Sequence, residues 1–346
     1  MPTRRSFLAA AGLAATAPLG AQTTAGTDVI RAVVALDGSG DFPTIQRAVD
    51  HVFDHVPSNV SRAILEIRPG VYRERVKVPR DQRHFTFEGR DAASTTISAS
   101  VNAKDAGGTF FSPVVEVNCD GFEAHNLTFE NTFGVGSQAV ALSIHSERAM
   151  FHNCRFSGWQ DTLYVAWGRQ YFRDCYIEGH VDFIFGDAAA VFDRCEIHSR
   201  GSGYIAAVSR TSPDEPTGFV FRDCRLTGDP GLRRDNQART EAAETPFPAR
   251  DSGKGVFLGR PWRDYARTVY LNCWMGAHIR PEGWDNWGIP AREKTAWFGE
   301  LGSSGPGADP AARAAWAHIV TPELAASFAP DVFLNGRDGW NPLRRL

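Results

Sequence analysis

The eight residues Phe151-His152-Asn153-Cys154-Arg155-Phe156-Ser157-Gly158 recur one unit later as Phe172-Arg173-Asp174-Cys175-Tyr176-Ile177-Glu178-Gly179. Each stretch has an aromatic residue three positions before its cysteine and a glycine four positions after it. Related stretches surround the later cysteines, and one earlier stretch has leucine in the cysteine position: Phe192–Ile197, Phe221–Gly228, Tyr270–Met275 and Ala124–Asn131. Successive cysteines from 154 to 273 are 21, 20, 29 and 49 residues apart. The chain therefore contains an internal repeat with a period of about 20 residues.

A repeat of this length, with one short alternating strand in each unit, is typical of a solenoid. Cys154 and Phe156 are two positions apart, so they lie on the same face of their strand. Small thiols and aliphatic side chains at equivalent positions are then expected to stack inward, coil upon coil. Because connections between parallel strands are right-handed, the repeat predicts an all-β fold, a right-handed parallel β-helix.

The cysteines have two open interpretations. Six cysteines in 346 residues are few for a disulfide scaffold, and none forms a Cys-x-x-Cys pair that would indicate a zinc site. The first interpretation is that they pack in the core as small hydrophobic residues. The second is a disulfide between adjacent coils, such as Cys175–Cys195, which stacked coils about 5 Å apart would allow.

A solenoid needs its ends covered, and the sequence offers short helices for this. Apolar residues at helical spacing predict a helix over Thr44–Val56 that caps the first coil. Pro310–Ile319 and Thr321–Ala325 are also predicted to be helical, and to pack along or over the coils. The charged, proline-interrupted stretch Asp229–Lys254 is interpreted as a surface excursion. We therefore expect one β-helix catalytic domain over residues 22–346.

The N-terminus differs in composition from the rest of the chain. Arg4-Arg5 precedes an apolar, alanine-rich stretch over Leu8–Leu19, which is too short to span a bilayer comfortably. This pattern predicts a twin-arginine export signal over residues 1–21. We expect the protein to be exported, and to work in the periplasm or as a secreted protein.

Composition excludes several other classes of function. The net charge of −3 and the isoelectric point near 6.4 give no support for a nucleic-acid partner. No later stretch is apolar enough to predict a membrane partner. The sequence also lacks the Gly-x-Ser-x-Gly, His-Glu-x-x-His and P-loop motifs of common hydrolases and nucleotide-binding proteins.

Two aspartates occupy the same phase of the repeat. Asp161 and Asp182 each lie seven residues after a cysteine and three after a glycine, and they are 21 residues apart. Coils in register would place their backbones about 4.8 Å apart. Two carboxylates so close do not both ionise readily, so one is expected to have a raised pKa. Such a pair suits acid–base or nucleophilic catalysis; a hydrogen-bonded aspartate ladder or a calcium site is the alternative, although calcium prefers more oxygen ligands.

Five short motifs follow one another along the chain: Gly70-Val-Tyr-Arg-Glu74, Gln138-Ala-Val-Ala-Leu142, Gln160-Asp-Thr-Leu163, Asp182-Phe-Ile-Phe-Gly186 and Leu258-Gly-Arg-Pro-Trp262. In these motifs and in their order, over roughly residues 37 to 342, the chain resembles the pectin methylesterases of the pectinesterase family. Each motif alone is weak evidence, and together they are specific. The resemblance implies hydrolysis of the C6 methyl esters of galacturonate in methylated pectin, without a metal or organic cofactor.

The resemblance also implies roles for individual residues. Asp182 would be the nucleophile, and Asp161 the general acid and then the general base. Gln138 and Gln160 would donate hydrogen bonds to the tetrahedral oxyanion, and Arg260 would keep Asp182 ionised. A backbone-bonded Gln138 and a purely structural ion pair of Arg260 are the competing interpretations.

Aromatic residues near these motifs are candidates for substrate binding. Trp262 is expected to stack on a sugar face, as its motif implies, and the remaining candidates are Tyr164, Phe185, Tyr265 and Trp287. The alternative for each aromatic residue is packing in the core.

Three other functions stay open at this stage. A β-helical polysaccharide depolymerase, either glycosidase or lyase, would also use paired charged groups. An esterase or thioesterase for a different ester would use the same nucleophile. A non-catalytic binding protein is the third, although binding alone needs no matched acid and nucleophile. We expect the protein to be a monomer.

Overall fold

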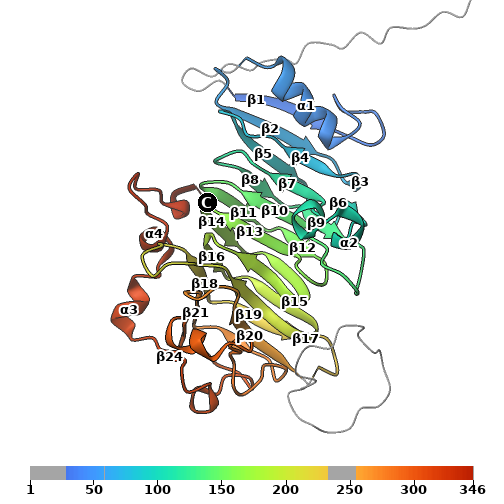
Figure 1. Ribbon diagram of the computed structural model, residues 1–346. Coiled ribbons are helices and arrows are strands. Elements are labelled where there is room, and N and C mark those ends of the chain that lie inside the picture. The colour runs from blue at the N-terminus through green and yellow to red at the C-terminus, as the bar shows by residue number, and fades with distance from the viewer. Residues whose placement is uncertain (1–28, 58, 233–254, 346) are drawn as a thin grey trace, which may run out of the picture.

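The computed structural model describes residues 29–57, 59–232 and 255–345; the expected export signal at 1–21 and most of the Asp229–Lys254 excursion lie outside these residues. The described chain forms parallel strands stacked coil upon coil (Figure 1). The right-handed parallel β-helix predicted from the repeat is the observed fold.

Within the described residues, one sheet of 11 strands forms the first face of the solenoid. Its strands, in sheet order, are β1 (Val29–Val34), β2 (Arg62–Ile67), β5 (His84–Gly89), β8 (Glu123–His125), β11 (Ala149–His152), β14 (Arg169–Arg173), β16 (Ala189–Asp193), β18 (Gly218–Arg222), β21 (Arg267–Leu271), β23 (Trp297–Leu301) and β24 (His318–Ile319).

A second sheet, with 13 strands in the described chain, bends to form two further faces. One face contains β3 (Gly70–Arg73), β6 (Thr95–Ala99), β9 (Thr128–Asn131), β12 (Arg155–Ser157), β19 (Arg225–Gly228) and β22 (Trp274–Met275). The other, which we call the third face, contains β4 (Val76–Val78), β7 (Val115–Val117), β10 (Leu142–His145), β13 (Leu163–Trp167) and β20 (Val256–Pro261). The long strands β15 (Tyr176–Gly186) and β17 (Glu196–Val208) run across both faces and join them.

The repeat positions stack in register inside the solenoid. Phe151 pairs with Phe172, and Phe172 with Phe192, each pair lying on adjacent parallel strands. Their rings stack with centroids 4.8 Å apart in both pairs, and the column continues through Phe221 to Tyr270. The coil spacing therefore equals the strand spacing of a sheet, and equivalent residues of successive units are direct neighbours.

The residue before each repeat cysteine, or its leucine equivalent, makes a tight turn between the first two strands of its coil. These residues have φ between 52° and 58°, in the left-handed region: Asn126, Asn153, Asp174, Arg194, Asp223 and Asn272. Asparagine and aspartate tolerate this conformation better than other non-glycine residues, and they fill five of the six positions. The repeat thus specifies both the buried column of rings and the tight turn between the first two strands of each coil.

The ends of the solenoid differ from each other. Helix α1 (Ile45–His55) begins after Thr44, whose hydroxyl accepts from the Arg47 amide, and it buries Ile45, Ala48, Val49 and Val52, as predicted. The predicted helix over 310–319 is wrong: this segment has a single 3₁₀ turn, η3 (Pro310–Ala312), followed by β24. The strand forms because His318 and Ile319 pair with β23 and so satisfy backbone groups that a helix would have paired internally.

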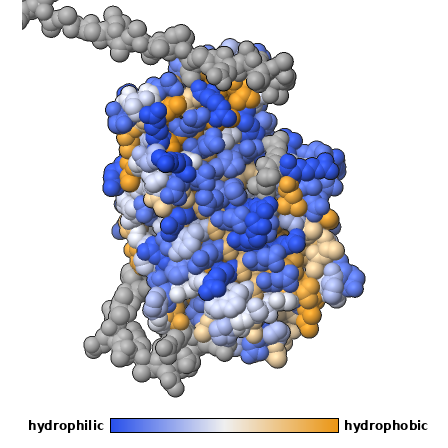
Figure 2. Space-filling view, turned by 180° about the vertical axis from the view of Figure 1, so that it is seen from behind, coloured by the Kyte–Doolittle hydropathy of each residue, from blue (hydrophilic) through white to orange (hydrophobic). Residues whose placement is uncertain are grey.

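The helix predicted over 321–325 is confirmed as α3 (Pro322–Ala326), and α4 (Pro330–Phe333) follows it. They do not close the end of the solenoid. This C-terminal segment instead lies along the outer side of the first sheet (Figure 1), where its apolar residues pack on Met150, Tyr171, Val191, Val220 and Val269. Seen from behind, hydrophilic residues dominate the middle of the surface (Figure 2). The remaining short helices are α2 (Ala103–Ala106), η1 (Thr109–Phe111), η2 (Pro290–Lys294) and η4 (Pro342–Arg345).

All six cysteines are buried and free, so the structure favours core packing over the Cys175–Cys195 disulfide. We predict that the folded, unreduced protein does not react with a thiol reagent such as Ellman's reagent, because solvent does not reach the sulfur atoms. After unfolding without reductant, six thiols per chain are expected to react. A count of four or fewer would show that a disulfide forms, and would contradict the six free thiols of the structure.

Candidate active site

The turn that holds each candidate aspartate lies between the second and third faces of the solenoid. Asp161 has φ 62° and Asp182 has φ 50°, so each occupies the left-handed region in its own coil. The Asp161 amide donates to the carbonyl of Val181 at 3.1 Å. Strand pairs on both sides keep the same 21-residue offset, with Phe156 opposite Ile177 and Leu163 opposite Ile184. The two aspartates are therefore equivalent residues of adjacent coils, about one strand spacing apart.

Asp182 is held by Arg260, which comes from β20, two strands away on the third face. The guanidinium donates from Nε to Oδ1 at 2.8 Å and from an Nη atom to Oδ2 at 2.6 Å. Only 10% of the Asp182 side chain and 18% of the Arg260 side chain are exposed. A bidentate pair with so little solvent fixes the orientation of the carboxylate as well as its charge.

Two aromatic rings enclose the guanidinium of Arg260. Its Cζ lies 3.8 Å from the ring centroid of Tyr204 and 3.8 Å from that of Trp287. Trp287 has φ 63°, which is unusual for a bulky residue, and the Asp285 carboxylate accepts its amide hydrogen at 2.7 Å. The rings exclude water and restrict the arginine to the geometry that meets Asp182.

The two carboxyl groups have different environments. Burial raises the pKa of Asp182, and the attraction and hydrogen bonds of Arg260 oppose that rise. Burial and the neighbouring charge of Asp182 raise the pKa of Asp161 well above its ordinary value, with Arg260 opposing only by attraction. Among the described residues, the Asp161 side chain has no hydrogen-bond partner. The arrangement therefore favours a proton on Asp161 and a negative charge on Asp182.

Gln138 and Gln160 lie in adjacent coils beside the aspartates. The Ala139 amide donates to the Gln160 carbonyl at 3.0 Å, which joins the two segments. Both side chains are half-buried, and neither amide group makes a hydrogen bond within the described part of the chain. Both amides are thus available to a ligand.

Four of the five aromatic candidates lie together over the third face. Tyr164 and Phe185 stack with centroids 4.7 Å apart, and Trp262 lies 6.0 Å from Phe185. These three and Trp287 pack around the buried Val140 and Ala207. Tyr265 is not part of this cluster, although it lies on the same loop as Trp262.

Three residues near the site were not predicted from the sequence: Tyr204, Asp285 and Phe110. Tyr204 pairs with Val181 on the adjacent coil, but the register shifts at this point of the strand, so the repeat period alone does not locate it. Asp285 lies beyond the long insertion, where no period applies. Phe110 reaches Tyr164 with a centroid separation of 5.1 Å from η1, which lies outside the repeating strands.

Two kinds of feature are absent from the described residues. They contain no group of three or more histidine, cysteine, aspartate or glutamate side chains arranged to hold a metal ion. None of the helices in 29–57, 59–232 and 255–345 is long and apolar enough to cross a membrane.

Several known proteins are similar to this chain in sequence and in fold. The Pectinesterase family model matches residues 31–337. Pectinesterase 31 of Arabidopsis thaliana is 38% identical over 313 residues, covering 87% of this chain and 91% of that protein. The carrot pectin methylesterase structure has a TM-score of 0.79 and 35% identity, covering 94% of this chain and 98% of that one. A pectin methylesterase in complex with a hexasaccharide has a TM-score of 0.70 and 26% identity, covering 90% and 98%. The chain belongs to the pectinesterase family.

Proposed function

We propose that the protein is a carbohydrate esterase that hydrolyses the C6 methyl esters of galacturonate in pectin to give pectate and methanol. The observation that supports this most strongly is a carboxylate, Asp182, that Arg260 holds through two hydrogen bonds beside a second carboxyl group, Asp161, whose pKa is raised. Family membership and the names of the relatives support the same reaction class. We further propose that the protein is exported and acts as a monomer.

In the first half of the proposed reaction, a carboxylate oxygen of Asp182 attacks the ester carbonyl carbon. The side-chain amides of Gln138 and Gln160 donate hydrogen bonds to the resulting oxyanion and stabilise it, since neither amide is used in a hydrogen bond with another described residue. Asp161 gives its proton to the methoxy oxygen as the C–O bond breaks, and methanol leaves. The galacturonate acyl group is then joined to Asp182 as an anhydride.

In the second half, Asp161 is ionised and acts as the base. It takes a proton from water, which attacks the acyl carbon; the bond to Asp182 breaks and the carboxylate returns to Arg260. The water proton remains on Asp161, so both residues regain their starting states. No metal or organic cofactor enters these steps.

A depolymerase remains the second candidate because paired carboxyl groups about 5 Å apart also suit a retaining glycosidase. Incubation with methylated pectin separates the two: the esterase releases methanol without shortening the chain. New reducing ends without methanol would contradict the proposal. Methanol release together with stronger hydrolysis of an acetyl or thioester substrate would point to a different preferred ester, and saturable pectin binding without any product would point to a binding protein.

We predict that Asp182→Asn lowers the rate of methanol release by roughly 10³-fold or more, because an amide oxygen is a poor nucleophile. The substitution keeps the size of the side chain, so the circular dichroism spectrum is expected to stay unchanged. Asp214→Asn, at an exposed loop position, is the matched control and should retain wild-type activity. Near-normal release by Asp182→Asn would exclude this residue as the nucleophile.

Asp161 is expected to reduce stability at neutral pH. Its pKa in the folded state is raised, so the native state binds more protons than the unfolded state between the two pKa values. The free energy of unfolding therefore falls as pH rises through that window. We predict that Asp161→Asn has a higher melting temperature than the wild type at neutral pH, and that the difference shrinks toward acid pH. A difference independent of pH, or of the size seen with Asp214→Asn, would contradict the raised pKa.

Arg260 is expected to set the acid limit of activity. Replacing it by glutamine removes the attraction and hydrogen bonds that lower the pKa of Asp182, so this pKa rises. We predict that the acid limb of kcat/KM against pH moves to higher pH in Arg260→Gln, along with a loss of rate. Arg194→Gln is the matched control, because Arg194 makes a bidentate but exposed pair with Asp174. If the acid limb of Arg260→Gln stays at the wild-type pH, Arg260 does not lower the pKa of Asp182.

A further inference from the structure

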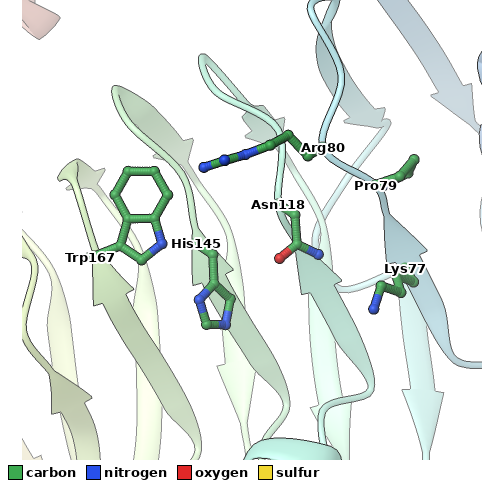
Figure 3. Close-up of a pocket in the computed structure, with 6 residues that line it drawn as sticks. All are labelled: Lys77, Pro79, Arg80, Asn118, His145 and Trp167. Carbon is green, nitrogen blue, oxygen red and sulfur yellow. The ribbon is translucent and has the colours of Figure 1, made fainter.

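A hollow lies on the third face, beyond the aromatic cluster. Six residues line a cavity of about 310 Å³: Lys77, Pro79, Arg80, Asn118, His145 and Trp167. They come from the carboxyl ends of β4, β7, β10 and β13 and from the residues that follow (Figure 3). The volume is at the lower end of the range for small-molecule sites. We call this the basic pocket.

Side-chain contacts link the basic pocket to the candidate active site. Trp167 pairs with His145 on the neighbouring strand, and the His145 ring meets the Tyr164 ring edge-on at 5.6 Å. Tyr164 in turn stacks on Phe185. A single row of registered residues also crosses the third face through both regions: Lys77, Glu116, Ser143, Tyr164, Phe185, Ala207 and Arg260. Lys77 is thus four strand spacings, about 19 Å, from Phe185.

The charges of the basic pocket are poorly compensated. The Arg80 guanidinium extends toward Trp167, with its Cζ 5.9 Å from the ring centroid (Figure 3), and within the described chain it makes no ion pair or hydrogen bond. Lys77 Nζ lies 3.3 Å from a Glu116 carboxylate oxygen, but the lysine side chain is 65% exposed. Exposed pairs of this kind contribute little, so the lysine remains available to another anion.

The pocket also offers a flat apolar surface. The side chain of Trp167 is exposed and lies at one end of the pocket in Figure 3, with the Arg80 guanidinium and the His145 ring both on the same side of it. A broad ring of this kind can stack on a sugar face, while a guanidinium pairs well with a carboxylate. The combination suits a sugar that carries a carboxylate.

We propose that the basic pocket is a subsite for a galacturonate unit whose carboxyl group is already free. The identity of the sugar rests on the proposed function. Arg80, whose guanidinium extends toward Trp167, contacts the carboxylate, and Trp167 contacts the ring. Lys77, which lies on the other side of Asn118 in Figure 3, attracts the anion from a greater distance. A methyl-esterified unit lacks the charge and is bound less well there. The protein therefore holds a demethylated stretch of the polymer in the basic pocket while Asp182 acts on a methylated unit of the same chain.

The test is direct binding of fully de-esterified hexagalacturonate, measured by calorimetry at low ionic strength. This oligomer has no ester to hydrolyse, so its binding does not depend on catalysis. We expect Arg80→Gln, Lys77→Gln and Trp167→Ala each to weaken binding about three- to tenfold, as the loss of a partly exposed charge or a stacked ring does. Glu116→Gln should strengthen binding, because it removes the anion that competes for Lys77. Arg73→Gln, an exposed arginine on the second face, is the control.

A parallel measurement uses the fully methyl-esterified hexamer, with Asp182→Asn added to every variant to prevent turnover. Unchanged affinity in Arg80→Gln and Lys77→Gln for this neutral ligand supports recognition of the carboxylate. Equal losses for both hexamers, or wild-type affinity of both variants for the de-esterified hexamer, would overturn the proposal. Methanol release by the wild type is scored separately, so a failed subsite and a failed esterase assignment give different results.

Discussion

Stacking of the coils in register is the constraint on which the rest of the structure depends. An offset of about 21 residues places equivalent side chains one strand spacing apart, and the interior satisfies it with a column of stacked rings. The same offset acts at the corner between the second and third faces. There it brings together two aspartates that are far apart in the sequence. The repeat itself therefore brings the two carboxyl groups together, because each of two successive units has an aspartate at the same position.

Adjacent carboxyl groups are costly unless their environments differ, and the fold makes them differ. Arg260 reaches Asp182 through two oriented hydrogen bonds, and rings of Tyr204 and Trp287 limit its movement. Asp161 is also buried, but its carboxyl group has no hydrogen-bond partner among the residues that the structure describes. The difference favours a proton on Asp161 beside an ionised Asp182, at the expense of some stability of the native state. The ion pair with Arg260, which comes from two strands away, also explains how a carboxylate can lie in the apolar run Val181-Asp182-Phe183.

The sequence was informative wherever the period holds. The β-helix, the inward column and the shared phase of Asp161 and Asp182 all follow from the spacing of Cys154 and Cys175. Outside the repeat the pattern fails: a strand replaces the helix expected over 310–319, because pairing with β23 outweighs local propensity. Arg260, Trp262 and Trp287 lie beyond the long insertion, and only a family motif located the first two; the clamp on Arg260 by Tyr204 needs three-dimensional register to be seen.

The central claim is that Asp161 carries a proton in the resting protein while Asp182 is ionised. Infrared difference spectroscopy in the carboxyl region, at the pH of maximal methanol release, tests it directly. The account predicts a protonated carboxyl band in the wild type that disappears in Asp161→Asn. A band that persists in Asp161→Asn but disappears in Asp182→Asn would place the proton on the proposed nucleophile and contradict the account.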